Sequence, residues 1–542
     1  MVEALANEEF DVLVIGGGIT GAGIALDATT RGLRTALVER GDFASGTSSK
    51  SSKMVHGGLR YLQQGDLRLV YQALCERQRL LNNAPHLVTV LPFLIPVLTK
   101  DGPISKKIAK ALRSALWMYD ITGGLRIGKR HQHLNAEQSL AHCPTLPAEK
   151  LSSGFVYYDA GADDARLTLT VARTAAANGA VVANHCEVVE LTKNAEGGAD
   201  GAVVDTGTGR TRVRAKVVVS ATGVWADTIR QLDEAADPDS LRPAKGVHIT
   251  VPWHLVRNEI AVIISVPGDK RSMFLVPWGQ LPDGTFEHCY IGTTDTDFVG
   301  DVDNPHTNDD DLDYMLKALQ HNLTSTITRD DVTGVWAGLR PLVKQASSGR
   351  TTDLSRRHTI TTGESGLITV TGGKLTTYRA MAEDTVDAAL GQIGRRRKCR
   401  TKKLRFVGAD GFKRVDIDHP DARLAGRYGT EMAELKALIA LDASLAEPMV
   451  PGLRYLRAEA VYGVRHEMAT SLIDVLTRRT RAHLENRSAC LRGAADLARV
   501  LAAELGWTNQ QIAAQVDAYR QLCDDELLAA NQPDSRHAET AP

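Results

Sequence analysis

Short apolar runs alternate with helical patterns through roughly the first 390 residues of the chain. Residues 10–16 (FDVLVIG) and 35–40 (TALVER) have the nearly continuous apolar character of strands buried in a parallel sheet. Residues 181–191 and 213–221 predict two later strands with a polar, turn-rich hairpin between them. The alternation of strands and helices favours an α/β fold.

The pattern changes between residues 246 and 291, where the repeats VHITVPW, AVIISVP, SMFLVPW and HCYIGTTD predict an antiparallel sheet. Beyond a basic connector at 395–403 (RRRKCRTKK), helical patterns dominate to about residue 525. They include 431–440, 457–476 and a helix opened by Thr508, with Gln511 at capping-box spacing. We expect a nucleotide-binding region at 8–395, in which a substrate part is interleaved at roughly 85–150 and 240–345. A helical domain at 400–530 and a disordered tail at 531–542 should follow it.

The amino-acid composition indicates the cellular compartment of the protein and the kind of partner it has. The 542 residues include 64 Lys plus Arg against 65 Asp plus Glu, a balance that argues against nucleic acid as the main partner. Seven scattered cysteines without a C-x-x-C pair favour reduced thiols in a cytoplasmic protein, and we expect no metal site. The most apolar stretch, residues 87–98, contains two prolines and is shorter than the roughly 20 residues of a membrane-spanning helix.

A dinucleotide-binding turn follows the first predicted strand. Gly16, Gly18 and Gly21 form a G-x-G-x-x-G in which the first glycine makes a tight turn, the second admits a pyrophosphate and the third lets helix pack on strand. The N-terminus of the following helix offers free N–H groups to phosphate. Glu39 ends the next strand, where its carboxylate can accept both ribose hydroxyls and argues against NADP. This motif alone leaves NAD and FAD open.

Two later segments favour FAD. Residues 217–227 (VVVSATGVWAD) resemble the second nucleotide-contacting motif of FAD-dependent oxidoreductases of the D-amino-acid-oxidase type. Residues 370–379 (VTGGKLTTYR) resemble the C-terminal flavin motif of the same proteins. The resemblance implies a Rossmann-like FAD-binding domain with an antiparallel-sheet substrate domain. It also implies cofactor contacts from Val188, Thr222, Gly223, Trp225, Gly373, Leu375 and Thr376.

The segment 41–62 (GDFASGTSSKSSKMVHGGLRYL) follows the ribose-binding strand. Its small polar residues, among them Ser48 and Ser49, can wrap a pyrophosphate and the flavin edge, although a flexible polar loop would have a similar composition. Near its end, a glycine pair stands between His56 and Arg60. Such a pair lets the backbone approach a ring while the two side chains point at a common ligand.

The motifs SSKSSKMVHGGLRYL, GTTD (292–295), GLRPL (338–342), TGGKLTTYR (371–379) and DVLTRRTR (474–481) resemble those of the flavin-dependent sn-glycerol-3-phosphate dehydrogenases, from about residue 8 to about residue 525. The resemblance implies oxidation of the C2 hydroxyl of glycerol 3-phosphate, with hydride passing to flavin N5. It implies a substrate phosphate held by Arg60, Arg340 and Lys374, with Tyr61 and either Arg356 or Arg357 nearby.

A base must accept the hydroxyl proton in this reaction. His56 is our first choice because imidazole is basic near neutral pH, and His248, in a Lys-Gly-x-His setting similar to that of the family, is the second. Lys374 can also polarise the hydroxyl or a flavin carbonyl. Three alternative functions stay open: a flavin amine oxidase, an oxygen-using glycerol-3-phosphate oxidase and a non-catalytic FAD-binding sensor.

The resemblance implies a quinone, ubiquinone or menaquinone, as electron acceptor. Residues 104–119 predict an amphipathic helix with an apolar stripe, a basic flank and Trp117 near its end. This pattern favours peripheral attachment to the inner face of the cell membrane, and an ordinary helix packed on the core is the alternative. For the C-terminal helical region a lid, a homodimer contact and simple packing all remain open.

Overall fold

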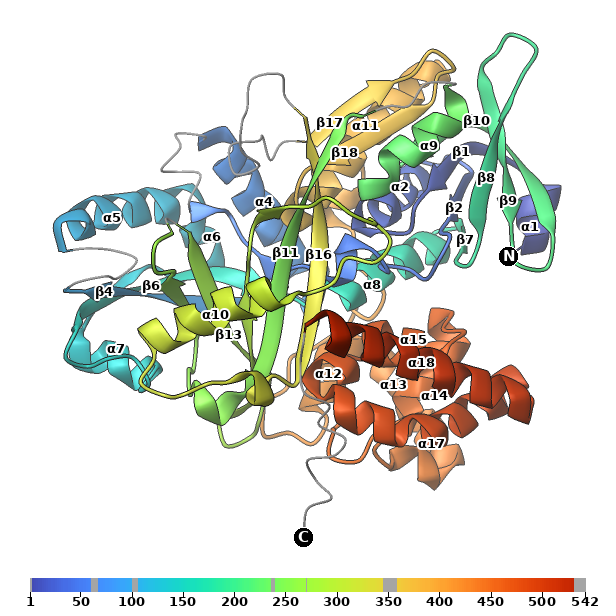
Figure 1. The fold of residues 1–542 in the computed structure, drawn as a ribbon. Coiled ribbons are helices and arrows are strands. Elements are labelled where there is room, and N and C mark those ends of the chain that lie inside the picture. Colours follow the sequence, from blue (N-terminus) through green and yellow to red (C-terminus); the bar gives the residue numbers. More distant parts are fainter. Residues whose placement is uncertain are drawn as a thin grey trace.

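The computed structural model describes residues 2–59, 67–99, 106–234, 239–269, 271–344 and 358–530. Two sheets lie side by side, and a cluster of C-terminal helices lies against both of them (Figure 1). The tail at 531–542, which the sequence predicts to be disordered, lies outside the described residues.

The first sheet has the strand order β17-β18-β10-β1-β2-β7 and is extended by the β8–β9 hairpin. Strands β18, β10, β1, β2 and β7 run parallel, so their carboxyl ends share one edge. This edge is where doubly wound sheets bind nucleotides. The strands are β1 Glu9–Ile15, β2 Thr35–Val38, β7 Val181–Ala183, β8 Glu187–Lys193, β9 Ala199–Asp205, β10 Arg210–Ser220, β17 His358–Thr362 and β18 Ile368–Gly372.

The second sheet is largely antiparallel and has the order β15-β11-β14-β13-β12-β4-β6-β3, with β16 beside β11 and β5 beside β6. Its longest strands have nearly continuous buried runs, so both faces of the sheet are covered along much of their length. The strands are β3 Met54–Val55, β4 Thr89–Leu98, β5 Gln132–Asn135, β6 Leu151–Gly161, β11 Leu241–Pro252, β12 Ala261–Ser265, β13 Ser272–Gln280, β14 Phe286–Gly292, β15 Thr296–Asp297 and β16 Gly334–Val343.

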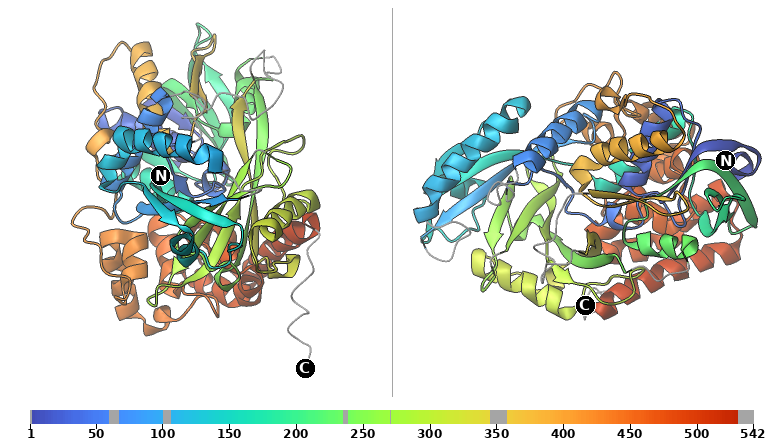
Figure 2. Two further views of the ribbon diagram at one scale, coloured as in Figure 1. Left: turned by 90° about the vertical axis from the view of Figure 1, so that its left-hand side faces the viewer. Right: turned by 90° about the horizontal axis from the view of Figure 1, so that it is seen from above.

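Helix α2 is the central helix of the nucleotide-binding half, because α8 and α11 both pack on it. In two further views the C-terminal helices stay grouped on one side of the sheets (Figure 2). The helices before this group are α1 Val2–Asn7, α2 Ile19–Thr30, α4 Leu67–Asn83, α5 Lys106–Tyr119, α6 Leu125–Ile127, α7 Ala136–His142, α8 Asp164–Ala177, α9 Ala226–Asp233, α10 Asp309–Asn322 and α11 Tyr378–Gln392. The C-terminal helices are α12 Ala422–Tyr428, α13 Met432–Leu441, α14 Arg457–Glu467, α15 Leu472–Asp474, α16 Ala482–Glu485, α17 Arg487–Leu505 and α18 Asn509–Ala529.

Most predicted elements are present, and two are wrong in extent. The single strand predicted over 181–191 is two strands, β7 beside β2 and β8 beside β9, separated at residues 184–186. The strands at 10–16, 35–40 and 213–221, the antiparallel strands of 246–291 and the capping box of Thr508 with Gln511 are confirmed. The helix predicted over 457–476 ends at Glu467, because Met468 has a left-handed backbone (φ 58°). No helix among the described residues is long and apolar enough to cross a bilayer.

The C-terminal helical domain is joined to the sheets by buried arginines of the DVLTRRTR segment. Arg479 forms a two-pronged pair with Asp42, just past the end of β2, at 2.6 and 2.7 Å. Both side chains are about 1% exposed. Arg481 pairs with two carboxylates, those of Asp163 and Asp164, at the start of α8. The segment therefore fixes the helical domain against the nucleotide-binding half.

The electrostatics of Asp42 show that the pairing is strong. Burial alone would raise the pKa of Asp42, but the charges of Arg479 and Arg478 outweigh it and hold the pKa below its usual range. Without Arg479, a buried carboxylate would lose its main counter-charge, which is far more costly than losing an exposed pair.

We expect Arg479→Ala to lower the free energy of unfolding by about 3–5 kcal/mol, measured by guanidinium titration. The control is Arg499→Ala, which removes an exposed arginine of the same domain paired with Asp496 and should change stability by less than about 0.5 kcal/mol. An equal, small effect of both substitutions would contradict the role of Arg479.

Candidate functional site

Two neighbouring cavities lie at the carboxyl edge of the first sheet. The larger has a volume of about 650 Å³ and the smaller about 220 Å³. Their walls share Thr47, Pro341 and the segment 373–375, so a ligand in one cavity contacts the same residues as a ligand in the other. Predicted cofactor residues line the larger cavity: Gly16, Gly18, Glu39, Ser48, Val188, Thr222, Gly223, Trp225, Gly373 and Leu375.

The glycines of the first turn leave no room for side chains. Gly16 has φ +106°, and a Cβ there would lie 2.8 Å from the carbonyl oxygen of Ala221, on the neighbouring strand end. A Cβ on Gly21 would lie 1.9 Å from the carbonyl oxygen of Gly16. The turn is thus tight, and the N-terminus of α2 opens directly onto the cavity, as a pyrophosphate requires.

Ser48 closes this turn from the other side. Its hydroxyl oxygen accepts a hydrogen bond of 2.9 Å from the backbone N–H of Ile19, the first residue of α2. The polar segment that follows the ribose-binding strand is therefore folded against the turn. Ser49, also predicted to contact the cofactor, is buried and lines neither cavity.

Glu39 lies at the end of β2 and faces the same cavity. Its carboxylate accepts hydrogen bonds from the backbone N–H groups of Gly17 (2.6 Å) and Gly41 (2.8 Å). Burial raises the pKa of Glu39, and these two bonds partly offset that rise. The two bonds orient the carboxylate at the position where a nucleotide ribose would lie.

Trp225 belongs to a small cluster at the mouth of the cavity that the sequence did not predict. Its indole N–H donates to Asp303 at 2.6 Å, and the guanidinium of Arg40 lies 4.6 Å from its ring. Arg40 and Asp303 also form an ion pair, although 263 positions separate them in the sequence. No local pattern relates residues so far apart.

The smaller cavity brings together the predicted chemistry. It is lined by His56, His248, Arg340, Lys374 and Thr376, together with Lys50 and Ser52, which the sequence analysis did not single out. Lys50 and Ser52 lie in the polar segment 41–62, so the composition of that segment was the available signal. Arg60, Tyr61, Arg356 and Arg357 lie outside the described residues.

Arg340, on β16, is held in place by the GTTD segment. Its Nη1 lies 3.0 Å from a carboxylate oxygen of Asp295, and its Nη2 donates to Thr293 and Thr294. A Cβ on Gly246 of the neighbouring strand would lie 2.6 Å from Nη2, so a glycine there leaves room for the guanidinium. The guanidinium is therefore positioned in advance of substrate binding.

His248 is clamped between strands. Its ring stacks on Trp336 with centroids 4.8 Å apart, and its Nε2 lies 2.8 Å from the hydroxyl of Ser52. A Cβ on Gly292 would lie 2.0 Å from the ring. Burial, and then the charges of Lys53 and Arg340, hold the pKa of His248 well below 6.5. His248 is thus a neutral group of fixed orientation.

His56 is anchored through its backbone. Its N–H donates to the hydroxyl of Thr376 at 3.1 Å, and that hydroxyl donates back to the His56 carbonyl at 3.2 Å. Thr376 belongs to the segment that follows β18, so these two bonds tie the predicted base to the predicted flavin motif. His56 and Lys374 lie on the wall of one cavity, as their proposed roles require.

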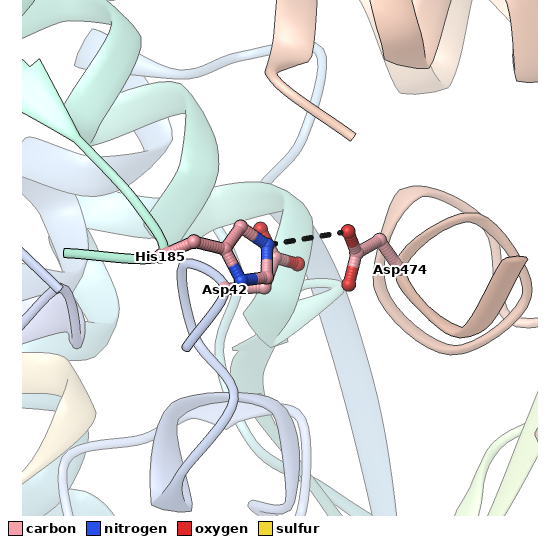
Figure 3. A group of neighbouring side chains, drawn as sticks. All are labelled: Asp42, His185 and Asp474. Carbon is pink, nitrogen blue, oxygen red and sulfur yellow. Dashed lines mark ion pairs between the residues drawn. The ribbon is translucent and has the colours of Figure 1, made fainter. Parts of the chain in front are cut away.

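Asp42, His185 and Asp474 form the cluster drawn in Figure 3, where Nε2 of the His185 ring faces a carboxylate oxygen of Asp474 at 3.6 Å. The spacing of their ligand atoms, within 4.8 Å, would suit a metal ion. However, Arg478 binds both carboxylates and Arg479 binds Asp42, so arginines already supply the positive charge. The group is an ion-pair junction between β2 and the C-terminal domain.

Comparison with known proteins identifies two family models along the chain. Residues 11–379 match the model described as FAD dependent oxidoreductase. Residues 399–512 match the model described as the C-terminal domain of alpha-glycerophosphate oxidase. The second match begins within the basic connector at 395–403 that precedes the helical domain.

Similar proteins cover nearly the whole chain. Glycerol-3-phosphate dehydrogenase 2 of Mycobacterium tuberculosis is 41% identical over 99% of this chain and 92% of its own length. The human mitochondrial glycerol-3-phosphate dehydrogenase is 35% identical over 96% of this chain and 74% of its own. The FAD complex of the Bacillus halodurans glycerol-3-phosphate dehydrogenase has a TM-score of 0.76 at 33% identity, covering 98% and 96% of the two chains. The predicted fold class and FAD as cofactor are confirmed.

We expect Gly21→Ala to abolish FAD binding, because its methyl group cannot fit beside the Gly16 carbonyl. The absorbance ratio at 450 and 280 nm of the purified protein measures retained flavin. Gly391→Ala is the matched control, since a Cβ there meets open space on α11. Normal flavin content in Gly21→Ala would refute the role of this turn.

Proposed function

Because the chain belongs to the family of FAD-dependent glycerol-3-phosphate dehydrogenases, we propose that it oxidises sn-glycerol 3-phosphate to dihydroxyacetone phosphate and passes the electrons to a membrane quinone. The observation that carries the substrate assignment is the smaller cavity. It places Arg340 and Lys374 beside His56, and it adjoins the cofactor cavity along residues 373–375.

The residues of the larger cavity fit FAD. Gly16 and the N-terminus of α2 receive a pyrophosphate, and Glu39 receives the ribose. Bound FAD supplies the acceptor for the hydride that leaves C2 of the substrate. The protein has to hold the substrate at the segment 373–375, exclude water and remove one proton.

In this proposal Arg340 and Lys374 bind the substrate phosphate. A phosphate dianion leaving water needs charge-assisted hydrogen bonds, and an arginine fork can supply two of them. The contacts of Arg340 with Asp295 and Thr293 fix the direction of its fork, so little side-chain freedom is lost on binding. Arg60, Tyr61 and either Arg356 or Arg357 complete the predicted set around the phosphate.

His56 accepts the proton of the C2 hydroxyl. His248 is less suited to this role because its pKa lies well below 6.5, whereas a base works best with a pKa near the working pH. We assign His248 a positioning role: stacked on Trp336 and bonded to Ser52, it forms a rigid wall of the substrate cavity.

The membrane proposal rests on exposed apolar residues around α5, where the structure corrects the sequence analysis. The predicted apolar stripe does not face outward, because Leu112, Leu116 and Tyr119 are buried in a core cluster that includes residues of β4 and β6. The exposed large residues lie beside that stripe, on α4, α5 and the turn that follows α5. They are Leu67, Tyr71, Trp117, Met118 and Ile121.

We propose that these five residues, here called the apolar patch, contact the acyl boundary of the membrane. Helices α4 and α5 both contact the segment Asp120–Gly124, which carries Ile121. Arg113 lies on α5, and Arg126 on α6 donates to the hydroxyl of Tyr71, so both can attract anionic headgroups beside the patch. Attachment at the inner face of the membrane would bring the flavoprotein to its quinone.

Anaerobic addition of glycerol 3-phosphate should bleach the flavin absorbance near 450 nm, and a soluble quinone should restore it faster than oxygen does.

His56→Ala should lower kcat by about 10²–10⁴ with little change in KM. Arg340→Gln should raise KM for glycerol 3-phosphate by at least about tenfold.

His142→Ala is the control for these kinetics, because His142 lies outside both cavities and pairs with Glu259. Near-wild-type turnover in His56→Ala would overturn the base assignment. An absence of bleaching would overturn the proposed activity, and stoichiometric hydrogen peroxide in air would replace quinone by oxygen as the acceptor.

Vesicle flotation tests the apolar patch. The protein should float with vesicles containing anionic lipid, and the double variant Trp117→Ser/Ile121→Ser should float about tenfold less, because the aromatic anchor and the most exposed residue of the patch are lost. Leu441→Ser removes an even more exposed apolar residue from the C-terminal domain and should float like the wild type. Unchanged flotation of the double variant would rule out this surface.

A further inference from the structure

A third cavity, of about 320 Å³, lies between the second sheet and the C-terminal helical domain. It shares no lining residue with the two cavities described above. Its walls come from β4, the end of β6, β13, β14, the start of α8 and α12. Neither the cofactor nor the substrate of the proposed reaction requires this space.

The carboxylates in its wall already have ion-pair or hydrogen-bond partners. Asp163 pairs with Arg427 and Arg481, and Glu287 pairs with Arg454. Glu485 accepts hydrogen bonds from the indole of Trp278 (3.0 Å) and the hydroxyl of Tyr455 (2.6 Å). Arg166 and Arg423, also in the wall, pair with buried glutamates behind it. Each of these groups therefore already has an ion-pair or hydrogen-bond partner in the described structure.

Arg414 and His86 are different. The Arg414 guanidinium donates to the Pro85 carbonyl at 2.7 Å, and no carboxylate of a described residue lies within ion-pair distance of it. His86 is 3% exposed, and its Nδ1 has no hydrogen-bond partner among the described residues. One end of the cavity thus has an exposed guanidinium with no ion-pair partner among the described residues, beside a buried ring nitrogen with no hydrogen-bond partner among them.

The potential at this end is positive. Burial, followed by the charges of Arg166, Arg405 and Arg414, lowers the pKa of His86 to about 3. His86 is therefore neutral near pH 7, and one of its ring nitrogens carries a proton. A cation would be repelled here, and an apolar ligand would leave the buried ring nitrogen without a partner, which is costly.

We propose that this cavity binds a small molecule carrying a phosphate group, with the phosphate held by Arg414 and by the Nδ1–H of His86. Two arginine N–H groups suit two phosphate oxygens, and a neutral imidazole can donate to a third. The aromatic side chains of Trp278, Tyr290 and Tyr455 line the rest of the cavity and provide contact area for the remainder of the ligand. The volume is that of a small-metabolite site.

Thermal unfolding of the FAD-loaded protein, titrated with inorganic phosphate at constant ionic strength, tests the site. The wild type should show a saturable rise in Tm, because a ligand that binds only the folded state stabilises it. Arg414→Ala and Arg414→Gln should weaken the phosphate affinity by at least about tenfold. Both variants should fold, because Arg414 makes no ion pair in the described structure.

Two further variants separate this site from its surroundings. Lys413→Ala removes a neighbouring exposed charge that does not line the cavity, and it should respond like the wild type. Arg340→Gln removes a substrate-site cation and should keep the response. The proposal fails if phosphate gives no saturable rise, if Arg414→Ala responds like the wild type, or if Arg340→Gln abolishes the response. Stabilisation by citrate and not by phosphate would overturn the ligand class.

Discussion

The bidentate pair between Asp42 and Arg479 is the interaction on which the rest of the structure depends. Asp42 lies three residues after Glu39, so the loop that leaves the ribose-binding strand is bound directly to the C-terminal domain. The same arginine donates to the carbonyl of Glu467, which ends α14. A buried ion pair offsets the cost of removing its two charges from water only when both partners are well hydrogen-bonded. Asp42 and Arg479 meet that condition. The C-terminal domain is therefore part of the scaffold of the nucleotide site.

The ends of strands from both sheets determine where the residues of the two neighbouring cavities lie. Three parallel strands, β1, β10 and β18, deliver Gly16, Thr222 and Gly373 to one edge, while β11 and β16 of the second sheet deliver His248 and Arg340 from the other side. The segment 373–375 belongs to both walls. Glycines clear the space at the critical crossings: Gly246 beneath Arg340 and Gly292 beneath His248. Positioning thus comes from regular elements, which are stiffer than loops.

Local patterns in the sequence predicted the parts of the site that local chemistry determines. The turn at Gly16 and the place of Glu39 just after β2 follow from strand, turn and helix rules that act within about 25 residues. Contacts between distant residues could not be predicted in this way. Trp225 with Asp303, and Asp42 with Arg479, bring together residues whose neighbours in the sequence give no hint of a partner. The stripe on α5 was visible as a pattern, but its burial depended on β4 and β6, which the pattern does not include.

The ion pair between Asp42 and Arg479 also has a consequence for the order of events during synthesis. Residue 42 leaves the ribosome long before residue 479, and at about 5–20 residues per second the delay is tens of seconds. Throughout that interval the loop behind Glu39 carries a carboxylate whose counter-charge has not yet been made. The contact that holds this loop to the C-terminal domain therefore forms only after residue 479 has been synthesised, among the last steps in completing the fold.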